Sequence, residues 1–256
     1  MWRWIKFAFL FPVGLLTGWF IYQLLTFPDI GSLRDHNPET TALIETRIKE
    51  ATARGEQPRR FQTWVPLEKI SPNLARAVLA GEDTNFATHN GFDYQAIQHA
   101  WDEAQREAEK EAKQEGETDQ SSWRWPSFDF KRGASTISQQ LAKNLYLTTE
   151  KSFIRKGKEA VLTYFLERKL SKRRILEIYL NVIEWGDGIY GAEAASQYYF
   201  RKPASALSPR EAAFLSAIIP NPRKDFNPQL NPRRVARRQR IIMRGMPFVK
   251  LPEGLN

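Results

Sequence analysis

The sequence predicts a mainly α-helical protein with one domain behind an apolar N-terminal segment. Signals for helix starts recur: Ser71-Pro72 and Ser208-Pro209 each place a capping serine before a proline. Apolar residues at positions 161, 162, 165 and 166, and again at 175, 176, 179 and 180, follow the spacing of amphipathic helices. Alternating strand patterns are scarce, and no internal repeat divides the chain. We therefore expect helices to build the core.

Residues 7–28 form an uncharged, strongly apolar run of 22 residues. A helix of this length covers about 33 Å, close to the roughly 30 Å hydrocarbon core of a bilayer. A cleaved signal peptide is the competing interpretation, but it usually has a shorter apolar stretch that ends in small residues. Arg3 and Lys6 precede the run and Asp29 follows it. This pattern predicts an uncleaved transmembrane anchor, with residues 1–6 in the cytosol and the rest of the chain across the membrane.

The part after the anchor divides into a short connection and one domain. Residues 29–60 are polar and contain one expected helix, 40–54, so we interpret them as a stalk before a domain at 61–256. The chain has no cysteine, which excludes disulfides, thiolate zinc sites and a cysteine nucleophile. Its three histidines argue against a multi-histidine metal site.

The charge of the chain is unevenly distributed. The formal net charge is +9, yet residues 101–119 contain eight acidic and three basic residues, a local balance of −5. The remainder carries +14, which favours an anionic partner: nucleic acid, a phospholipid surface or a phosphorylated ligand. Within this acidic insertion, at about 101–130, low hydrophobicity at 109–122 predicts a solvated helix end and a mobile loop. The basic tail, 231–250, is expected either to lie on anionic headgroups or to be a soluble helix end.

Three polar clusters contain the residues suited to chemistry. The first runs from Glu82 to Gly91 and begins with two adjacent acids at the end of an expected helix, against the helix dipole. The second runs from Gly133 to Asn144, where a capping box of Thr136 and Gln139 explains only part of the polar content. In the third, cations surround Glu159, so we expect this carboxylate to stay ionised. Two carboxylates in contrasting surroundings are typical of acid–base work on a sugar.

These clusters match a set of motifs in order. They read E-D-x-x-F-x-x-H-x-G from Glu82, G-x-S-T-I-x-Q-Q-x-x-K-N from Gly133, and R-K-x-x-E from Arg155. K-x-x-I-L-E-x-Y-L-N follows from Lys172, and a G-x-x-G-x-E-A-A stretch from Gly188. The set resembles the peptidoglycan glycosyltransferase family over about residues 62–225. The forms around 132–135 and 184–188 look most like its monofunctional biosynthetic members from Gram-negative bacteria.

The resemblance implies a lysozyme-like, mainly helical fold and the substrate lipid II, which is polymerised with inversion while undecaprenyl pyrophosphate leaves. It implies that Glu82 is the general base and that Glu159, with nearby cations, holds the donor pyrophosphate. The implied substrate-binding residues are Asp83, Phe86, His89, Gly91, Ser135, Thr136, Gln139, Gln140, Lys143, Asn144, Arg155, Lys156 and Lys158. No cofactor is expected to be obligatory, although a divalent cation, Mg or Mn, on Glu159 or Glu82 stays open.

The resemblance also implies partners and a location. The expected partners are lipid II, the growing lipid-linked glycan chain, the membrane, and proteins of cell-wall synthesis or of the divisome; nucleic acid is not expected. The expected location is the bacterial inner membrane, in a single pass with the catalytic domain in the periplasm. Transpeptidase activity is not expected, because only about thirty residues follow position 225 and no K-T-G triad occurs.

Two other functions compete with the polymerase. A lytic glycosidase or transglycosylase would cut the same polymer, but it has no need of the Arg155–Glu159 cluster, since cleaving a glycan involves no pyrophosphate. An anchored adaptor would hold nucleic acid or anionic lipid through its basic face and would tolerate Glu82→Gln. The acidic insertion departs from the shorter connection of the family, and is interpreted either as an enlarged flap beside the cleft or as a tolerated surface insertion.

Overall fold

The structure is a computed structural model that describes residues 14, 17–18, 25–114, 135–148 and 152–255. Most of the predicted anchor, 7–28, and the second part of the acidic insertion lie outside these residues. Within the described ranges, no helix has both the length and the apolar content needed to cross a bilayer. The anchor therefore stays a prediction.

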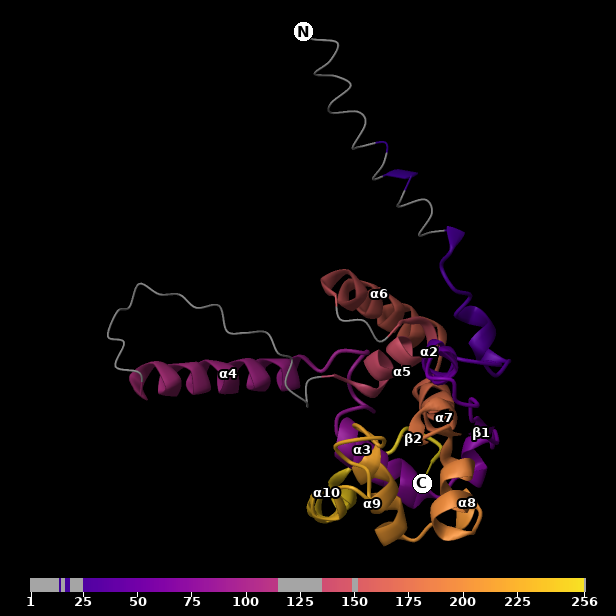
Figure 1. Ribbon diagram of the computed structural model, residues 1–256. Coiled ribbons are helices and arrows are strands. Elements are labelled where there is room, and N and C mark those ends of the chain that lie inside the picture. Colours follow the sequence, from indigo (N-terminus) through magenta and orange to yellow (C-terminus); the bar gives the residue numbers. More distant parts are fainter. Residues whose placement is uncertain (1–13, 15–16, 19–24, 115–134, 149–151, 256) are drawn as a thin grey trace.

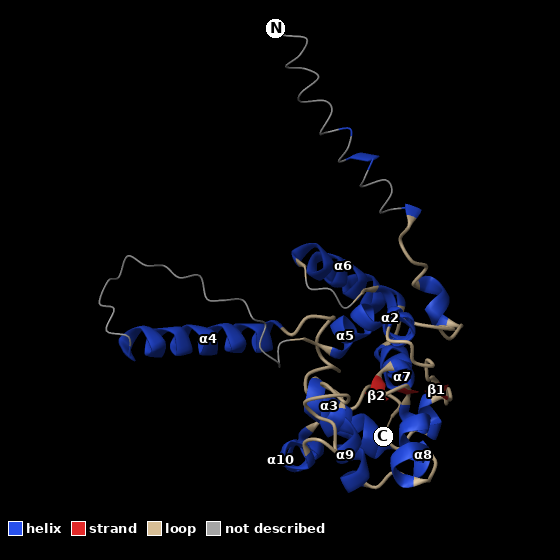
Figure 2. Cartoon of the chain, in the orientation of Figure 1, coloured by secondary structure: helices blue, strands red, loops and turns tan. Residues whose placement is uncertain are grey.

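The described residues confirm a mainly helical fold (Figures 1 and 2). The longer helices are α2 (Ala42–Ala53), α3 (Pro72–Glu82), α4 (Tyr94–Gln114), α5 (Ile137–Tyr146), α6 (Phe153–Lys169), α7 (Lys172–Val182), α8 (Ala192–Phe200), α9 (Pro209–Ile218) and α10 (Pro232–Gly245). Short 3-10 helices are η1 (Gly31–Arg34), η2 (Leu67–Lys69), η3 (Ala204–Ala206) and η4 (Met246–Phe248).

A small three-stranded sheet completes the fold. Its strands are β1 (Phe61–Gln62), β2 (Glu184–Gly186) and β3 (Ile189–Tyr190), in the order β1-β3-β2. β3 pairs parallel to β1, with Phe61 opposite Ile189, and antiparallel to β2. The sheet therefore fastens the chain that precedes η2 to the turn that follows α7.

The predicted helix starts are present. Ser71 accepts a hydrogen bond from the N–H of Asn73 and has Pro72 at the first helical position, and Ser208 and Glu211 form a capping box at the start of α9. Both arrangements satisfy N–H groups that a helix start leaves without partners. The positions of α3 and α9 thus follow from local sequence.

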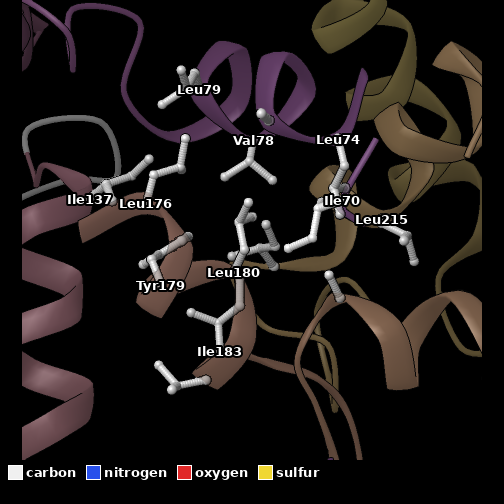
Figure 3. Close-up of a cluster of buried hydrophobic side chains, with 14 of the residues drawn as sticks. Ile70, Leu74, Val78, Leu79, Ile137, Leu176, Tyr179, Leu180, Ile183 and Leu215 are labelled. Carbon is white, nitrogen blue, oxygen red and sulfur yellow. The ribbon is translucent and has the colours of Figure 1, made fainter. Parts of the chain in front are cut away.

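The core lies between α3, α5, α7 and α9. Figure 3 shows Val78 and Leu79 of α3 facing Leu176, Tyr179 and Leu180 of α7. All four apolar positions predicted on α7 are fully buried, but on α6 only Leu162 and Leu166 are buried, while Val161 and Phe165 are exposed. The apolar spacing thus correctly predicts a helix in both segments, but it correctly predicts the buried face only in α7.

The segment expected to be a stalk, 29–60, packs on the domain. Ile30, Leu33 and Ile44 are buried, and α2 contacts α5. Arg47 of α2 donates to Oε2 of the buried Glu184 at 3.0 and 3.1 Å. The segment was expected to be a stalk because its few apolar residues are spread among polar ones. Their partners are brought close only by the tertiary structure.

Helix α4 extends away from the rest of the body (Figure 1). Asp93 caps it by accepting a hydrogen bond from the N–H of Ala96 at 2.9 Å. The helix continues to Gln114, well into the acidic insertion. The predicted loop after it falls outside the described residues.

Candidate active site

Glu82 is the last residue of α3, and its side chain is only 10% exposed. Its carboxylate accepts two hydrogen bonds from elements far away in sequence. Gln140 of α5 donates through Nε2 to Oε2 at 2.9 Å, and Arg238 of α10 donates through Nη2 to Oε1 at 2.8 Å. The site is therefore assembled where three helices meet.

A cleft of about 370 Å³ lies beside this carboxylate. Its walls come from the end of α3, the loop that follows, the first turns of α4 and the start of α5. The residues that line it are Ala80, Gly81, Glu82, Asp83, Thr84, Asn85, Asp93, Gln95, Ala96, His99, Ser135 and Thr136. Glu82 thus lines a space that can admit a ligand.

Gln140 is itself held in place by the core. The hydroxyl of the buried Tyr179 donates to Oε1 of Gln140 at 2.8 Å. Since this bond occupies the amide oxygen, the amide nitrogen is left to donate to Glu82. Tyr179 therefore fixes which end of the amide faces the carboxylate.

Arg238 connects the C-terminal helix to the site. The Nη2 atom that donates to Glu82 also donates to the carbonyl oxygen of Gly81 at 2.8 Å. Nε of Arg238 is buried and has no hydrogen-bond partner within the described residues. The guanidinium lies 5.5 Å from the ring centre of Phe226. These contacts place a positive charge directly against Glu82.

Burial is the largest influence on the ionisation of Glu82. It raises the pKa of this carboxyl from the ordinary value of 4.5, because removal from water disfavours the charged form. The charge of Arg238 and the hydrogen bonds from Gln140 and Arg238 lower the pKa, but do not cancel the effect of burial. A carboxylate with a raised pKa is a better proton acceptor once it is ionised.

Glu159 lies on α6 in different surroundings. Its side chain is 4% exposed and is paired with Arg155 at 2.9 Å and with Lys156. Both cations come from the preceding turn of the same helix, where residues three and four positions apart are neighbours. Nε of Arg155 is buried without a partner among the described residues. A buried carboxylate here supports two cations at the surface of α6.

Lys143 of α5 is close enough to both carboxylates for each to raise its pKa. The net shift is nevertheless downward from 10.5, because desolvation dominates and Arg155 and Lys156 repel its charge. The ammonium group is largely surrounded by protein atoms, although the residue as a whole is exposed. Lys143 therefore adds a positive group between the surroundings of Glu82 and those of Glu159.

The other acid of the first motif, Asp83, is engaged inside the protein. It accepts hydrogen bonds from Nε2 of His89 at 2.9 and 3.0 Å, and from the N–H of Ile137, at the start of α5, at 2.9 Å. Nδ1 of His89 accepts from the N–H of Gly91 at 3.0 Å, so the neutral ring carries its proton on Nε2. Asp83 and His89 thereby fasten the loop after α3 to α5.

Gly91 and the capping box of α5 continue this frame. Gly91 has a φ of +91°, and a Cβ atom there would lie 2.9 Å from Thr163 and 3.0 Å from Glu167. Its carbonyl accepts from the hydroxyl of Thr136 at 2.7 Å. Thr136 and Gln139 form the predicted capping box, and both are buried. At position 91, a residue larger than glycine has no room.

The remaining predicted residues are either buried behind the site or exposed near it. Phe86 is fully buried, with the ammonium of Lys172 4.5 Å from its ring centre. Ser135 is partly exposed and lines the cleft. Asn144 is partly exposed on α5, and Lys158 is exposed on α6. The structure therefore brings together Glu82, Gln140 and Lys143, and separately Arg155, Lys156 and Glu159, with Ser135 at the cleft wall.

The donor set at the two carboxylates does not fit a divalent cation. Glu82 is occupied by Arg238 and Gln140, and Glu159 by Arg155 and Lys156. In the described part of the chain, no group of three or more His, Cys, Asp and Glu side chains could hold a metal ion.

Comparisons with known proteins identify the family of the chain. A family model described as transglycosylase matches residues 48–118 and 121–247. The chain belongs to the transglycosylase family. A protein of Azoarcus sp. (strain BH72) named biosynthetic peptidoglycan transglycosylase is 42% identical over 252 residues, which cover 98% of each chain. Proteins of the same name from Chromobacterium violaceum and Thiobacillus denitrificans are also 42% identical, over 239 and 252 residues.

As a member of this family, the chain is an enzyme that transfers glycosyl groups. Two contacts of this transglycosylase were not predicted from sequence. Arg238 is part of the basic tail, for which only a headgroup contact or a soluble helix end was expected. Tyr179 is in the fourth motif, and its spacing predicted only burial. For Tyr179 the signal was available, since a buried phenolic hydroxyl needs a polar partner.

Proposed function

We propose that this transglycosylase polymerises lipid II into glycan strands, as the biosynthetic peptidoglycan transglycosylase name of its relatives suggests. The proposal rests on two carboxylates in contrasting surroundings. Glu82 lies beside a cleft and has a raised pKa, whereas Glu159 is paired with two cations. Lipid II is a disaccharide-pentapeptide on undecaprenyl pyrophosphate. A polymerase of this substrate needs a proton acceptor at the acceptor sugar and positive charge at the leaving group.

In the proposed step, the 4-hydroxyl of the acceptor N-acetylglucosamine attacks the anomeric carbon of the growing chain. The new glycosidic C–O bond forms as the bond from that carbon to the pyrophosphate breaks, so the configuration inverts. Glu82 takes the proton of the attacking hydroxyl, and the electron pair of the broken bond leaves with the pyrophosphate. The raised pKa of Glu82 supports this role.

The donor pyrophosphate is proposed to bind at Arg155, Lys156, Lys158 and Lys143. Arg and Lys side chains neutralise phosphoryl oxygens with charge-assisted hydrogen bonds, so they stabilise the leaving group as charge develops on it. Glu159 then acts as a positioning residue. Its own side chain is only 4% exposed, and it holds Arg155 and Lys156 by ion pairs. Ser135, Gln140 and Asn144 are proposed to contact sugar or phosphate.

The buried residues of the motifs are proposed to support the walls of the cleft without contacting the substrate. Asp83, Phe86, His89 and Gly91 keep the loop after α3 against the start of α5. Thr136 and Gln139 hold that helix start. Substitution of these residues is expected to reduce activity through the position of Glu82 and Gln140.

We also propose a cell-envelope enzyme with residues 7–28 as a single-pass inner-membrane anchor, a domain of lysozyme-like arrangement in the periplasm, and no transpeptidase activity. The uncharged run of 22 residues and the basic residues before it support this topology. Such an anchor keeps the site near a substrate whose lipid is in the membrane.

The function is tested with the purified full chain and labelled lipid II, followed by gel separation of glycan strands. A ladder of products that muramidase digests is the expected result. Degradation of preformed strands, without new ladders, would support the lytic reaction instead. Absence of any change to lipid II, with binding that follows net charge, would support an adaptor.

A further inference from the structure

A second cavity, of about 430 Å³, lies away from the cleft beside Glu82. Its walls come from the end of α2, the chain between α2 and β1, and the turn between β2 and β3, with one side chain from the loop after α9. In Figure 1, β1 lies on the opposite side of the body from α10, the helix whose Arg238 contacts Glu82. Among the described residues, none lines both cavities. The second cavity is therefore separate from the proposed site of transfer.

Tyr190, on β3, lines this cavity and has an unused hydroxyl. The residue is only 1% exposed, yet its hydroxyl makes no hydrogen bond with any described residue. Burial raises the pKa of this phenol, so the hydroxyl keeps its proton and can donate. A buried hydroxyl without a partner is unfavourable, since buried polar groups normally form hydrogen bonds. A ligand with an acceptor oxygen in the cavity would supply the missing bond.

Arg59 is the second group of the cavity without a partner. It is exposed, and no described residue forms an ion pair or a hydrogen bond with its guanidinium. Its backbone is nevertheless fixed, because the carbonyl of Gly188 accepts from the N–H of Phe61 at 2.7 Å. Gly188 has a φ of +72°, and a Cβ atom there would lie 2.5 Å from the Cβ of Arg59. The turn between β2 and β3 thus holds the start of the Arg59 side chain in place.

The other three arginines that line the cavity are already paired. Arg54 pairs with Glu56 at 2.7 Å and Arg223 with Asp187 at 3.2 Å, and both carboxylates are more than half exposed. Arg47 pairs with two glutamates that do not line the cavity. Among the described residues, the cavity therefore offers one cation without an ion pair, beside two exposed carboxylates.

One unpaired cation and one hydroxyl donor match a carboxylate. A carboxylate carries one negative charge and accepts through two oxygens, and the planar fork of an arginine binds it through two parallel hydrogen bonds. Phosphate fits less well, because it brings more negative charge toward Glu56 and Asp187 and offers them no N–H group. A neutral sugar has no charge for Arg59. Pockets for small ligands usually have about 300–1,000 Å³, so the cavity has room for more than the carboxylate itself.

We propose that this cavity binds the terminal carboxylate of a peptide, with Arg59 and the hydroxyl of Tyr190 as its donors. The N–H groups near the end of the peptide then donate to Glu56 and Asp187. The inference stands apart from the proposed function, because the contacts of both catalytic-site glutamates come from other residues. The same group is present on the pentapeptide of a sugar-linked substrate and on a free peptide.

Binding is measured on the purified full chain without lipid II, so that polymerisation does not enter the result. Fluorescence anisotropy follows a pentapeptide labelled at its N-terminus, either with a free C-terminal carboxylate or as the C-terminal amide. Arg59→Gln and Tyr190→Phe each remove one proposed donor. Arg60→Gln is the matched control, since Arg60 is the next residue, is also exposed, and bonds Gln62 outside the cavity. Thermal unfolding checks the fold of Tyr190→Phe, because this residue is buried.

We expect Arg59→Gln and Tyr190→Phe each to weaken binding of the peptide acid by about tenfold or more, since each removes a hydrogen bond to a charged group. The amide should bind weakly to the wild type, and Arg60→Gln should bind the acid as the wild type does. Equal binding of acid and amide, or unchanged affinity in Arg59→Gln, would overturn the inference.

Two competitors complete the test. Inorganic phosphate that displaces the peptide at equal concentration would overturn the inference, in favour of a general anion site. An unlabelled disaccharide-pentapeptide without its lipid is then compared with the unlabelled free pentapeptide. Stronger competition by the sugar-linked form would identify the peptide of the substrate as the source of the carboxylate, and the reverse order would identify free peptides.

Discussion

Glu82 and Glu159 are the same residue type, both nearly buried, yet their neighbours differ. Glu82 is held by an amide of α5 and an arginine of α10, and it borders a cleft. Glu159 is held by two cations of its own helix and does not line that cleft. Burial raises the pKa of Glu82, so this carboxylate can accept a proton. In the proposed function, the surroundings, rather than the residue type, therefore assign one carboxylate to proton transfer and the other to holding cations.

The largest expected effect comes from removal of the proton acceptor. Glu82→Gln keeps the size and shape of the side chain, but it replaces one acceptor oxygen by a donor NH2 group and has no carboxylate to take up the proton. The polymerisation rate at saturating lipid II should therefore fall by about 10²- to 10⁴-fold. The rate is measured from gel-resolved strands. Glu68→Gln, an exposed glutamate paired with Arg173, serves as the control and should keep the wild-type rate. A rate close to wild type in Glu82→Gln would exclude Glu82 as the general base.

A smaller effect of a different kind is expected at the second carboxylate. Glu159→Gln leaves Arg155 and Lys156 without their anionic partner, so they no longer hold one geometry toward the donor. We expect KM for lipid II to rise by about tenfold, a cost of about 1.4 kcal/mol in affinity. Initial rates over a range of lipid II concentrations measure this change. An unchanged KM would remove the positioning role of Glu159.

The third prediction concerns the pH dependence of the rate. In the proposed step, Glu82 accepts a proton only as a carboxylate, so activity is expected to rise as the pH increases through its pKa. The positive charge of Arg238 lowers that pKa. Arg238→Gln should therefore raise the pKa further and move the acidic limb of the kcat/KM profile to higher pH. Arg234→Gln, which removes a more exposed cation from the same helix, should leave the limb in place. A limb that stays fixed in Arg238→Gln would contradict the assigned pairing.

The smallest effect is expected at the hydroxyl that orients Gln140. Tyr179→Phe removes one hydrogen bond, so the amide can turn its oxygen toward Glu82. A net loss of about 1 kcal/mol corresponds to a rate about fivefold lower. Circular dichroism of the heated protein checks that the fold is retained. A variant as active as the wild type would show that the orientation of the amide does not matter.

Much of the fold could be predicted from local sequence. Ser71, Thr136 and Ser208 start helices where their capping patterns predict, because capping depends only on residues within one turn. The exposed face of α6 could not be predicted in the same way. Its apolar residues fit a buried face equally well, and only the tertiary contacts separate Val161 from Leu162.

The candidate site was partly predictable for a similar reason. The motifs identified both carboxylates, but not which polar neighbours face a ligand. Asp83 follows Glu82 directly, yet it bonds Ile137, 54 positions later in the chain. Arg238 is 156 positions away from Glu82, in a tail with no motif. Contacts over such distances depend on the tertiary structure that brings the end of α3 next to α5 and α10, and sequence spacing does not contain this information.

The two carboxylates are expected to have separable tasks. The most direct test measures lipid II affinity and turnover at saturation for Glu82→Gln and Glu159→Gln in the same reconstituted preparations. We expect Glu82→Gln to bind lipid II as the wild type does and to lose turnover, whereas Glu159→Gln should lose mainly affinity. Equal losses of affinity and turnover in both variants would contradict the division of tasks.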